Sequence, residues 1–275
     1  MSNKVLKPKK ASLYQFTQKY SNNIDNCIEF FKSMKWPEGF SCDRCGCHKY
    51  YLVKRVGKTK TSYVLECSSC HKQHSLLSGT IFQSCKLDLY KLLLGIFLFF
   101  NENKGISAVD LCSILDVNYK TALLLESKCR ILMSLSNSDK LLNSLFYEAD
   151  VFNIGARSKN KAGRASEQQP ILGILSTDKE NNYPRFIKLR VITDYTGLSL
   201  KKNIEKCCVL SHDALLNTDG EKGFNTLNEE IQVKNEKISY EEKDHRLLWL
   251  NIIIGNIKNN ICLLYTSPSP RDTER

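Results

Sequence analysis

The sequence predicts a mixed α+β fold in which a small metal-held β unit and a helical segment precede a larger mixed sheet. Three observations predict it. Two Cys-x-x-Cys pairs stand among short β-prone runs, apolar residues recur at helical spacing on both sides of them, and the spacing changes toward a period of two after Leu145. With 275 residues, the chain is long enough for two domains, or for one larger domain with an appendage.

The composition narrows the classes of partner. Lys and Arg number 40 against 29 Asp and Glu, a formal charge of +11, which favours anionic partners such as DNA. The longest apolar run, Leu92–Phe100, is well short of the roughly 20 residues that span a bilayer, so we expect no membrane partner. The start, MSNKVLKPKK, has no apolar core of a secretory signal. We therefore expect a protein of the cytoplasm or nucleoid in a bacterium, or of the nucleus in a eukaryote.

The first segment, residues 1–39, combines a basic arm with one helix. Residues 1–20 carry several lysines and no acidic residue, which favours contact with phosphates. Apolar residues recur at three- and four-residue steps from Leu13 to Met34, which predicts a helix there. The sequence Trp36-Pro37-Glu38-Gly39 ends it.

The second segment, residues 40–80, contains the two cysteine pairs and two β-prone runs, Tyr50–Val53 and Tyr63–Leu65. Inside a cell, close cysteine pairs more often bind metal than form disulfides. Two pairs at this spacing predict a zinc ribbon whose four-sulfur site is structural. The predicted ligands are Cys42, Cys45, Cys67 and Cys70. Four neighbours could substitute for a ligand, but the double pair is already complete, so we expect them not to bind: Cys47, His48, His71 and His74.

The third segment, residues 81–140, is predicted to be helical. Leu87–Phe100 is apolar enough for a buried helix, and two further patterns follow at Ser107–Leu115 and Tyr119–Leu135. The last two, joined by a three-residue break, fit a helix-turn-helix with Asn118 as the cap of its second helix. The residues at the DNA-reading end would then be Tyr119, Lys120 and Thr121. A helical hairpin that only packs is the alternative.

The fourth segment, residues 141–262, alternates strands and helices, which predicts a mixed sheet with helices packed against it. The expected strands are Phe146–Ile154, Pro170–Leu175, Phe186–Ile192 and one around Ala214–Thr218; the expected helices are Leu198–Cys207 and Leu247–Ile261. Residues 157–164 are too basic for a strand interior and predict a hairpin loop. Its basic residues, expected to contact DNA, are Arg157, Lys159, Lys161 and Arg164.

Carboxylates in this segment suggest a second metal site. Glu148 and Asp150 share one face of a predicted strand, and Asp219 ends a later strand just before Gly220. Two carboxylates that meet at neighbouring strand ends suit magnesium, which prefers oxygen ligands. Spacing alone leaves the alternative open, because Asp is common in strand-end turns. Glu148 could equally be a spare ligand or form an ion pair with the basic loop.

The order of motifs along nearly the whole chain resembles that of zinc-ribbon insertion-sequence transposases, bacterial relatives of the eukaryotic Merlin transposons. The motifs are Trp36-Pro37-Glu38-Gly39-Phe40, the two cysteine pairs, Ser78-Gly79-Thr80-Ile81-Phe82, Glu148-Ala149-Asp150, Thr218-Asp219-Gly220 and Ile254-Gly255-Asn256-Ile257-Lys258. The resemblance implies a ribonuclease-H-like core with a DDE-type triad whose third member is Asn in one branch.

Carried over by position, the resemblance implies catalytic Asp150, Asp219 and Asn256, followed by Lys258, with magnesium or manganese held mainly by the two Asp residues. It implies DNA cleavage and strand transfer at transposon terminal inverted repeats and in target DNA, without a covalent enzyme–DNA bond. A homo-oligomer on DNA is a further family expectation.

The chain departs from the family pattern at its C-terminal end. Residues 263–275 break every earlier pattern and resemble translated adapter sequence, so we expect a non-native, unpacked tail and a core truncated near Cys262. An inactive or domesticated DNA-binding derivative is the first alternative to an active transposase. A zinc-ribbon regulator with an unrelated C-terminal domain is the second.

Overall fold

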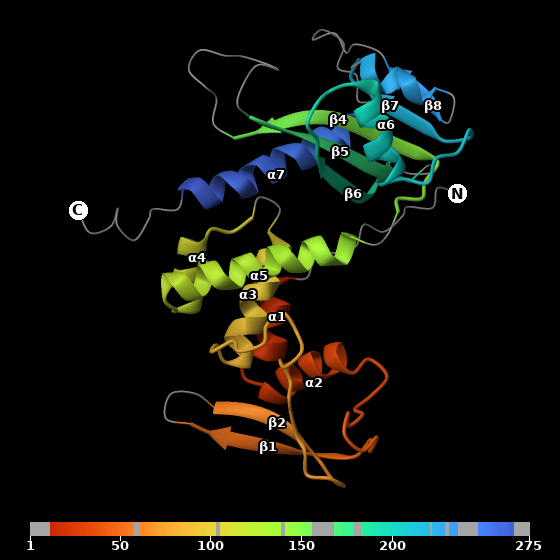
Figure 1. The fold of residues 1–275 in the computed structure, drawn as a ribbon. Coiled ribbons are helices and arrows are strands. Elements are labelled where there is room, and N and C mark those ends of the chain that lie inside the picture. The colour runs from red at the N-terminus through yellow and green to blue at the C-terminus, as the bar shows by residue number, and fades with distance from the viewer. Residues whose placement is uncertain are drawn as a thin grey trace, which may run out of the picture. The chain divides into compact units, whose positions relative to one another are not determined.

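A computed structural model describes residues 12–57, 61–102, 105–138, 141–155, 168–178, 183–220, 222–228, 231–235 and 247–266. The chain forms two compact units, Leu6–Ser134 and Leu135–Cys262, called here the N-terminal and C-terminal units (Figure 1). Helices and two sheets alternate along the chain, so the predicted mixed α+β class is confirmed. The finer division into five segments stays a prediction.

The N-terminal unit begins with two helices where one was predicted. Helix α1 spans Leu13–Tyr20, and α2 spans Ile24–Lys35. The break arises because the side chain of Asn23 accepts a hydrogen bond from the backbone N–H of Asn26 at 3.2 Å, which starts a new helix. Apolar spacing continues across the break, so periodicity alone does not reveal this cap.

The first sheet contains three antiparallel strands in the order β1-β2-β3. Strand β1 spans Tyr50–Val56 and β2 spans Thr61–Cys67, which confirms the two predicted strands and lengthens both. Strand β3, Gln73–Ser75, was not predicted, because three residues are too few to show a period. It pairs with β2 through Leu65 and His74 and so brings the chain back over the second cysteine pair.

Three further helices complete the N-terminal unit: α3 (Leu89–Asn101), α4 (Ala108–Leu115) and α5 (Tyr119–Ser138). The carboxylate of Asp88 caps α3 by accepting from the backbone N–H of Lys91 at 2.8 Å. A Cβ atom on Gly95 would lie 2.5 Å from Leu125, so this glycine permits close packing of α3 against α5. Ribbon residues such as Phe40 and Leu65 belong to the same buried cluster as these helices.

The C-terminal unit is built on a five-stranded mixed sheet in the order β6-β5-β4-β7-β8. Strand β4 pairs antiparallel with β5, β5 antiparallel with β6, and β4 and β8 pair parallel with β7 on either side of it. The strands are β4 (Phe146–Ile154), β5 (Gln169–Thr177), β6 (Pro184–Val191), β7 (Leu215–Thr218) and β8 (Gln232–Asn235). Strand β8 was not predicted, because it lies in a stretch of the sequence that is too polar to indicate a strand.

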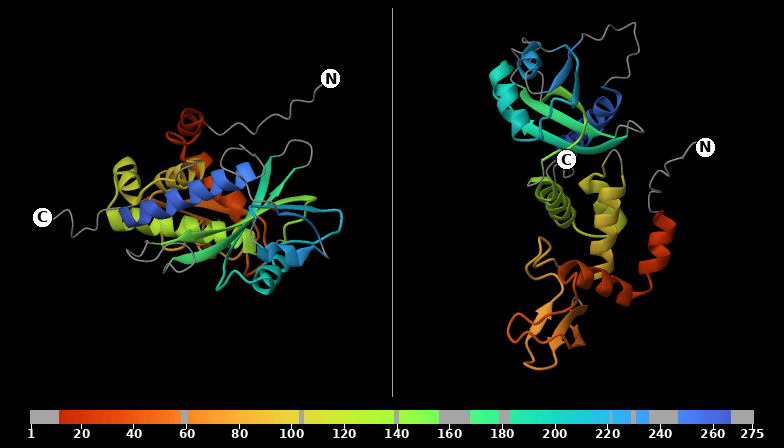
Figure 2. Two further views of the ribbon diagram at one scale, coloured as in Figure 1. Left: turned by 90° about the horizontal axis from the view of Figure 1, so that it is seen from above. Right: turned by 90° about the vertical axis from the view of Figure 1, so that its right-hand side faces the viewer.

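Helices cover both faces of this sheet. Helix α6 (Gly197–Glu205) and the short helix η2 (Lys222–Leu227) cover one face, where Tyr147 and Leu172 are buried. Helix α7 (Leu248–Thr266) covers the other face; Figure 2, right, shows the sheet between α6 and α7. Side chains alternate along β4, so Glu148, Asp150 and Phe152 lie on the α7 face.

Helix α7 continues to Thr266, past the Ile261 boundary expected from the sequence. The proposed non-native tail therefore stays a prediction, since residues 267–275 lie outside the described residues. The loop with Arg157, Lys159, Lys161 and Arg164 and the basic arm of residues 1–11 also lie outside them.

Candidate zinc, DNA-binding and carboxylate sites

Each cysteine pair sits in a tight turn of the same design. The backbone N–H of Gly46 donates to the carbonyl of Cys42 at 2.8 Å, and that of His71 donates to Cys67 at 3.0 Å. Both donors have a positive φ, 71° at Gly46 and 58° at His71. Glycine adopts this conformation without strain, whereas His71 adopts it despite its Cβ atom. The two turns therefore present two sulfurs each.

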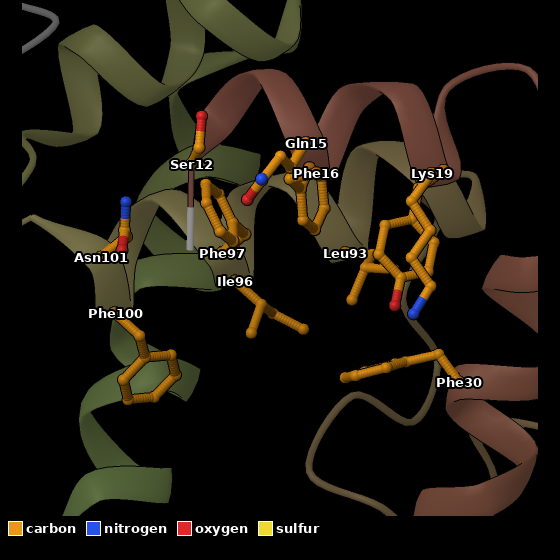
Figure 3. A pocket seen from close by; sticks show the side chains of 11 residues that line it. Ser12, Gln15, Phe16, Lys19, Phe30, Leu93, Ile96, Phe97, Phe100 and Asn101 are labelled. Atoms are coloured by element: carbon orange, nitrogen blue, oxygen red, sulfur yellow. The ribbon is translucent and has the colours of Figure 1, made fainter. Parts of the chain in front are cut away.

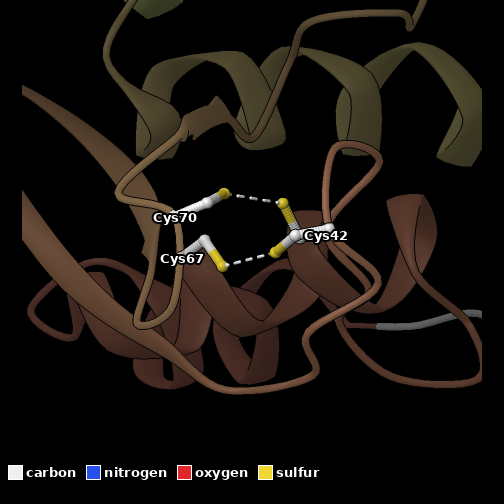
Figure 4. Close-up of side chains that lie close together, drawn as sticks. Cys42, Cys67 and Cys70 are labelled. Atoms are coloured by element: carbon white, nitrogen blue, oxygen red, sulfur yellow. Dashed lines mark hydrogen bonds between the residues drawn. The ribbon is translucent and has the colours of Figure 1, made fainter.

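The four sulfur atoms converge. The Sγ atoms of Cys42 and Cys70 are 3.5 Å apart, as are those of Cys45 and Cys67, and all four lie within 4.8 Å of one another (Figure 4). Tetrahedral zinc with bonds of about 2.3 Å would separate sulfurs by roughly 3.8 Å. The cluster therefore fits structural zinc, as the sequence predicted.

Hydrogen bonds favour the thiolate at Cys42. Burial has the largest single effect on this thiol and raises its pKa. Backbone amides of its own turn, with the side chains of His74 and Cys70, act in the opposite direction and bring the pKa down to about 6. A thiolate at neutral pH is the form that binds zinc.

Three of the four neighbours have other partners. The Nδ1 atom of His48 lies 3.0 Å from the carbonyl of Phe40, Nδ1 of His71 lies 3.2 Å from Glu66, and the sulfur of Cys47 lies 3.5 Å from the hydroxyl of Ser68. These contacts occupy all three side chains.

His74 is different. It is buried, its Nε2 atom has no hydrogen-bond partner, and it forms a compact group with Cys42 and Asp43. His74 is thus the neighbour best placed to affect the zinc site, although the four-sulfur set is complete without it.

The predicted helix-turn-helix residues lie where the sequence placed them. Asp116 adopts a left-handed conformation after α4, and the side chain of Asn118 accepts from the backbone N–H of Lys120 at 2.9 Å. Asn118 therefore caps α5 as expected. Lys120 is exposed and Tyr119 and Thr121 are half-buried at the same end of the helix.

The N-terminal unit also contains an apolar pocket of about 460 Å³ between α1, α2 and α3 (Figure 3). Its wall includes Phe16 and Phe97, whose rings stack with centroids 4.2 Å apart. Lys19 is the charged residue among those that line it. No group of metal-ligating or catalytic side chains gathers among these lining residues, so the pocket suggests no chemistry.

The carboxylate site forms where β4 and β7 run side by side. Glu148 pairs with Asn217 in this parallel pairing, so Asp150 and Asp219 occupy the next matching positions on the same face. Across β4 on the other side, Asp150 pairs with Gly173 of β5, which has no side chain. The structure therefore brings together the two predicted carboxylates from strands far apart in the sequence.

The environment of Asp150 favours its protonated form in the metal-free protein. Burial, first, and then the negative charge of Asp219 raise the pKa of Asp150 to about 7, while the backbone N–H of Val151 and the charge of Lys258 oppose this shift. Two facing carboxylates repel one another when both are ionised, and a cation bound between them relieves this repulsion. The pair therefore fits magnesium or manganese, although no further Asp, Glu, His or Cys of the described residues joins it to form a group of three.

Helix α7 presents two different flanks to the sheet. Trp249 packs against Tyr183 beside β6, with ring centroids 5.5 Å apart. Lys258 places its Nζ atom 5.5 Å from the ring centroid of Phe152 on β4, and its charge acts on Asp150. Successive residues turn about 100° around a helix, so Asn256 lies within about 20° of Trp249 and about 160° from Lys258.

Asn251 is an exposed residue of α7 that shares a flank of the helix with Lys258. Seven positions before Lys258, it lies within about 20° of it around α7, on the flank away from Trp249 and β6. Asp219 follows β7, on the opposite side of β4 from β5 and β6. Lys258 thus lies on the side of the carboxylates, since its charge acts on Asp150, and Asn256 lies about 160° away from it around the helix.

Glu148 has a partner that neither of the two alternatives from the sequence includes. Only 2% of it is exposed, and its Oε2 atom accepts a hydrogen bond from the backbone N–H of Leu250, in the first turn of α7, at 2.8 Å. Burial raises the pKa of Glu148 to about 7, and the Leu250 N–H acts in the opposite direction. The basic loop lies outside the described residues, and Glu148 forms no metal-binding group of three with Asp150 and Asp219.

Comparison with known families finds a match in the first part of the chain. The family described as the transposase zinc-ribbon domain matches residues 23–73, which comprise α2, both cysteine turns and the start of β3. The match supports a structural zinc site and a transposase-related DNA-binding role. No curated protein matches the chain. Among the residues that the structure describes, no helix is long and apolar enough to cross a membrane.

Proposed function

We propose that the chain is a DNA transposase of an insertion sequence, which binds transposon ends and catalyses metal-dependent DNA cleavage and strand transfer. One observation carries the proposal: a chain with a transposase zinc ribbon also brings half-buried Asp150 on one strand together with exposed Asp219, which directly follows the adjacent parallel strand. Neither feature alone would suffice, because ribbons occur in many DNA-binding proteins and paired carboxylates in many hydrolases.

The topology of the C-terminal unit supports a ribonuclease-H-like core. Three strands form an antiparallel meander, and two further strands add parallel to the first of them, in the order β6-β5-β4-β7-β8. This is the arrangement expected from the resemblance to DDE transposases. It explains why Asp150 lies on the central strand and Asp219 at the end of its parallel neighbour.

Asp150 and Asp219 would hold the divalent ions. When bound, such ions activate the attacking hydroxyl and stabilise charge on the entering and leaving oxygens of the phosphodiester. Lys258 is close enough to affect Asp150 and carries a positive charge suited to a DNA phosphate beside the carboxylates. The chain supplies no nucleophile of its own in this scheme, so its task is to position DNA and ions.

A third oxygen ligand would come from α7. The family resemblance assigns Asn256, while the flank shared with Lys258 favours Asn251. An asparagine offers only a neutral carbonyl oxygen, so either residue would orient the ions more than neutralise them. The two candidates are separable by mutation.

DNA binding is assigned to the N-terminal unit. The ribbon carries the family match, and the α4–α5 pair presents an exposed Lys120 at the start of its second helix. The basic loop with Arg157 and Arg164 is a further candidate for phosphate contact, from the sequence alone. Paired transposon ends would require a homo-oligomer on DNA.

The test is cleavage of a linear DNA that contains the gene with its flanking sequences. Purified protein with magnesium or manganese should cut near the ends of the element, and Asp150→Asn should lower the rate by at least about 100-fold. The matched control is Asp213→Asn, an exposed residue of the same unit, which should cleave like the unchanged protein.

Binding without cleavage under any metal condition would overturn the catalytic proposal. It would support a transposase-derived DNA-binding protein instead. Absence of both binding and cleavage would favour a zinc-ribbon protein of unrelated activity.

A further inference from the structure

The carboxyl group of Glu148 forms a hydrogen bond with a residue far away in the sequence. Its Oε2 atom accepts from the backbone N–H of Leu250, which is 102 residues later in the chain. Leu250 is the third residue of α7, and the first N–H groups of a helix have no partner within the helix. The bond is buried, so no solvent competes for it.

A second attachment lies two helical turns further along. Lys258 places its Nζ atom 5.5 Å from the ring centroid of Phe152, which follows Glu148 by four residues on β4. Four strand residues span about 13 Å, and the eight residues from Leu250 to Lys258 span about 12 Å of helix. The distance between the two contacts is therefore about the same along β4 as along α7, and Asp150 lies halfway between them on β4.

Apolar packing between these points holds one face of α7 against the sheet. Leu250 and Ile254 are buried against Phe152 and Leu175, and Trp249 packs on Tyr183. Rotation of α7 away from this position would carry Lys258 and Asn251 away from the side of Asp219. The direction in which Lys258 and Asn251 point thus depends on the contacts that fix the first turn of α7 on β4.

We propose that Glu148 is a positioning residue, which fixes the first turn of α7 on β4 and thereby sets the flank with Lys258 and Asn251 beside Asp150 and Asp219. This inference rests on the proposed function for its catalytic consequence, but the anchoring itself does not. It assigns Glu148 a role different from that of a metal ligand.

The neighbouring strand makes one substitution especially informative. Asn217 is the register partner of Glu148 on β7, and its Oδ1 atom is buried without a hydrogen-bond partner. In Glu148→Gln, the new carbonyl oxygen can still accept from Leu250, and the new amide N–H group lies on the same sheet face as the unpartnered oxygen of Asn217. If Glu148 anchors α7, this substitution keeps the anchoring hydrogen bond. If Glu148 binds magnesium, the substitution removes the negative charge of the ligand.

Hydrogen exchange of the whole protein, without DNA or metal, tests the anchor directly. In Glu148→Ala, amides of residues 248–254 should exchange at least about tenfold faster than in the unchanged protein. Glu148→Gln should stay within about threefold of it. The exposed Glu205 of α6 provides the control, since Glu205→Ala should leave these amides unchanged. Unchanged exchange in Glu148→Ala would overturn the anchor.

Cleavage of the same linear DNA distinguishes between the two roles of Glu148, an anchor of α7 or a magnesium ligand. Glu148→Ala should lower the rate by at least about tenfold, while Glu148→Gln should keep most of the rate at the same magnesium requirement. A Glu148→Gln protein that needs much more magnesium would show that Glu148 is a ligand and would overturn the proposal. If Glu148→Ala does not fold, Glu148→Asp, one methylene shorter, replaces it in both measurements with the same expected direction.

Failure of the proposed function gives a different pattern. The unchanged protein would then not cleave at all, while the exchange experiment would still give its result. The two proposals are therefore distinguishable.

Discussion

The zinc site and the carboxylate site are built in opposite ways. The zinc ligands come from two local turns of one small sheet, and backbone hydrogen bonds within each turn already aim the sulfurs at a common point. The carboxylate site takes Asp150, Asp219 and Lys258 from two strands and a helix. Its two charges repel one another until a cation arrives. The zinc site is thus part of what stabilises its small sheet. The carboxylate site, in contrast, brings two repelling charges together in a sheet that folds without a metal.

This difference teaches where each metal should act. A closed set of four sulfurs leaves no position for a substrate, so removal of zinc should affect structure. An open pair of carboxylates leaves coordination positions free, so removal of magnesium should affect the reaction and little else. The following predictions test this contrast, in order of expected effect.

Loss of zinc should unfold the ribbon. Cys67 is fully buried in the core that joins the ribbon to the helices, and zinc binding in small domains supplies about 10 kcal/mol or more of folding free energy. Cys67→Ser should therefore abolish zinc binding and the cooperative thermal unfolding of the N-terminal unit. Metal analysis and circular dichroism measure both.

The matched control is Cys47→Ser, beside the site but outside the four-sulfur set. It should keep its zinc and its melting temperature. If Cys47→Ser loses zinc while Cys67→Ser retains it, the ligand assignment is wrong.

Mutation of the two asparagines on α7 should separate their roles. Asn251→Ala should lower the cleavage rate by about 100-fold, because Asn251 lies on the flank of Lys258. Asn256→Ala should change the rate by less than about threefold. Initial cleavage rates at saturating magnesium measure both, and the reverse order would restore the assignment implied by the family resemblance.

Metal-free protein should lose stability as the pH rises. The pKa of Asp150 in the folded state is about 7, above its ordinary value of 3.8, so the folded protein holds more protons than the unfolded chain between these values. The contribution of Asp150 to stability is then greatest at low pH within this window and falls by about 2 kcal/mol between about pH 5 and about pH 8. Glu148, whose pKa is also raised, adds a fall of the same sign. Urea unfolding of the C-terminal unit at each pH measures this change.

Asp150→Asn supplies the comparison for the pH effect. It should reduce the dependence on pH and leave a smaller slope from Glu148, whose pKa is also raised. A slope equal to that of the unchanged protein would mean that Asp150 does not carry the effect.

Lys120→Ala should give the smallest effect. The residue is exposed at the start of α5, so its loss should weaken DNA binding by about threefold to tenfold and reduce the salt dependence by about one phosphate contact. Titration at several salt concentrations measures this, with Lys202→Ala on α6 as an exposed control. Equal losses in both variants would argue against a specific role of α5.

Local patterns explain which parts were predictable from the sequence. The cysteine spacing identified the zinc site, because the two turns are local and leave a motif. The strand period identified β4, and Gly220 after Asp219 marked the end of β7. The cysteine turns, the period of β4 and the end of β7 each depend on residues that are close together in the chain, so each leaves a recognisable pattern in the sequence.

Features that depend on tertiary contacts were missed. Asn23 interrupts an otherwise continuous helical period, and β8 is polar because it lies in a segment with little apolar spacing of its own. The role of Glu148 depends on Leu250, and the choice between Asn251 and Asn256 depends on which flank of α7 meets the sheet. No spacing rule contains such information, because it arises only when α7 is docked.

The long separation between Glu148 and Leu250 has a consequence for the newly made protein. A ribosome adding about 5–20 residues per second needs roughly 5–20 s to travel the 102 residues from one to the other. During that interval the ribbon and the helices of the N-terminal unit are already synthesised and can take up zinc. Under the proposed function, a nascent chain therefore acquires its DNA-binding unit before its cleavage site is complete, so translation imposes an order on the two activities.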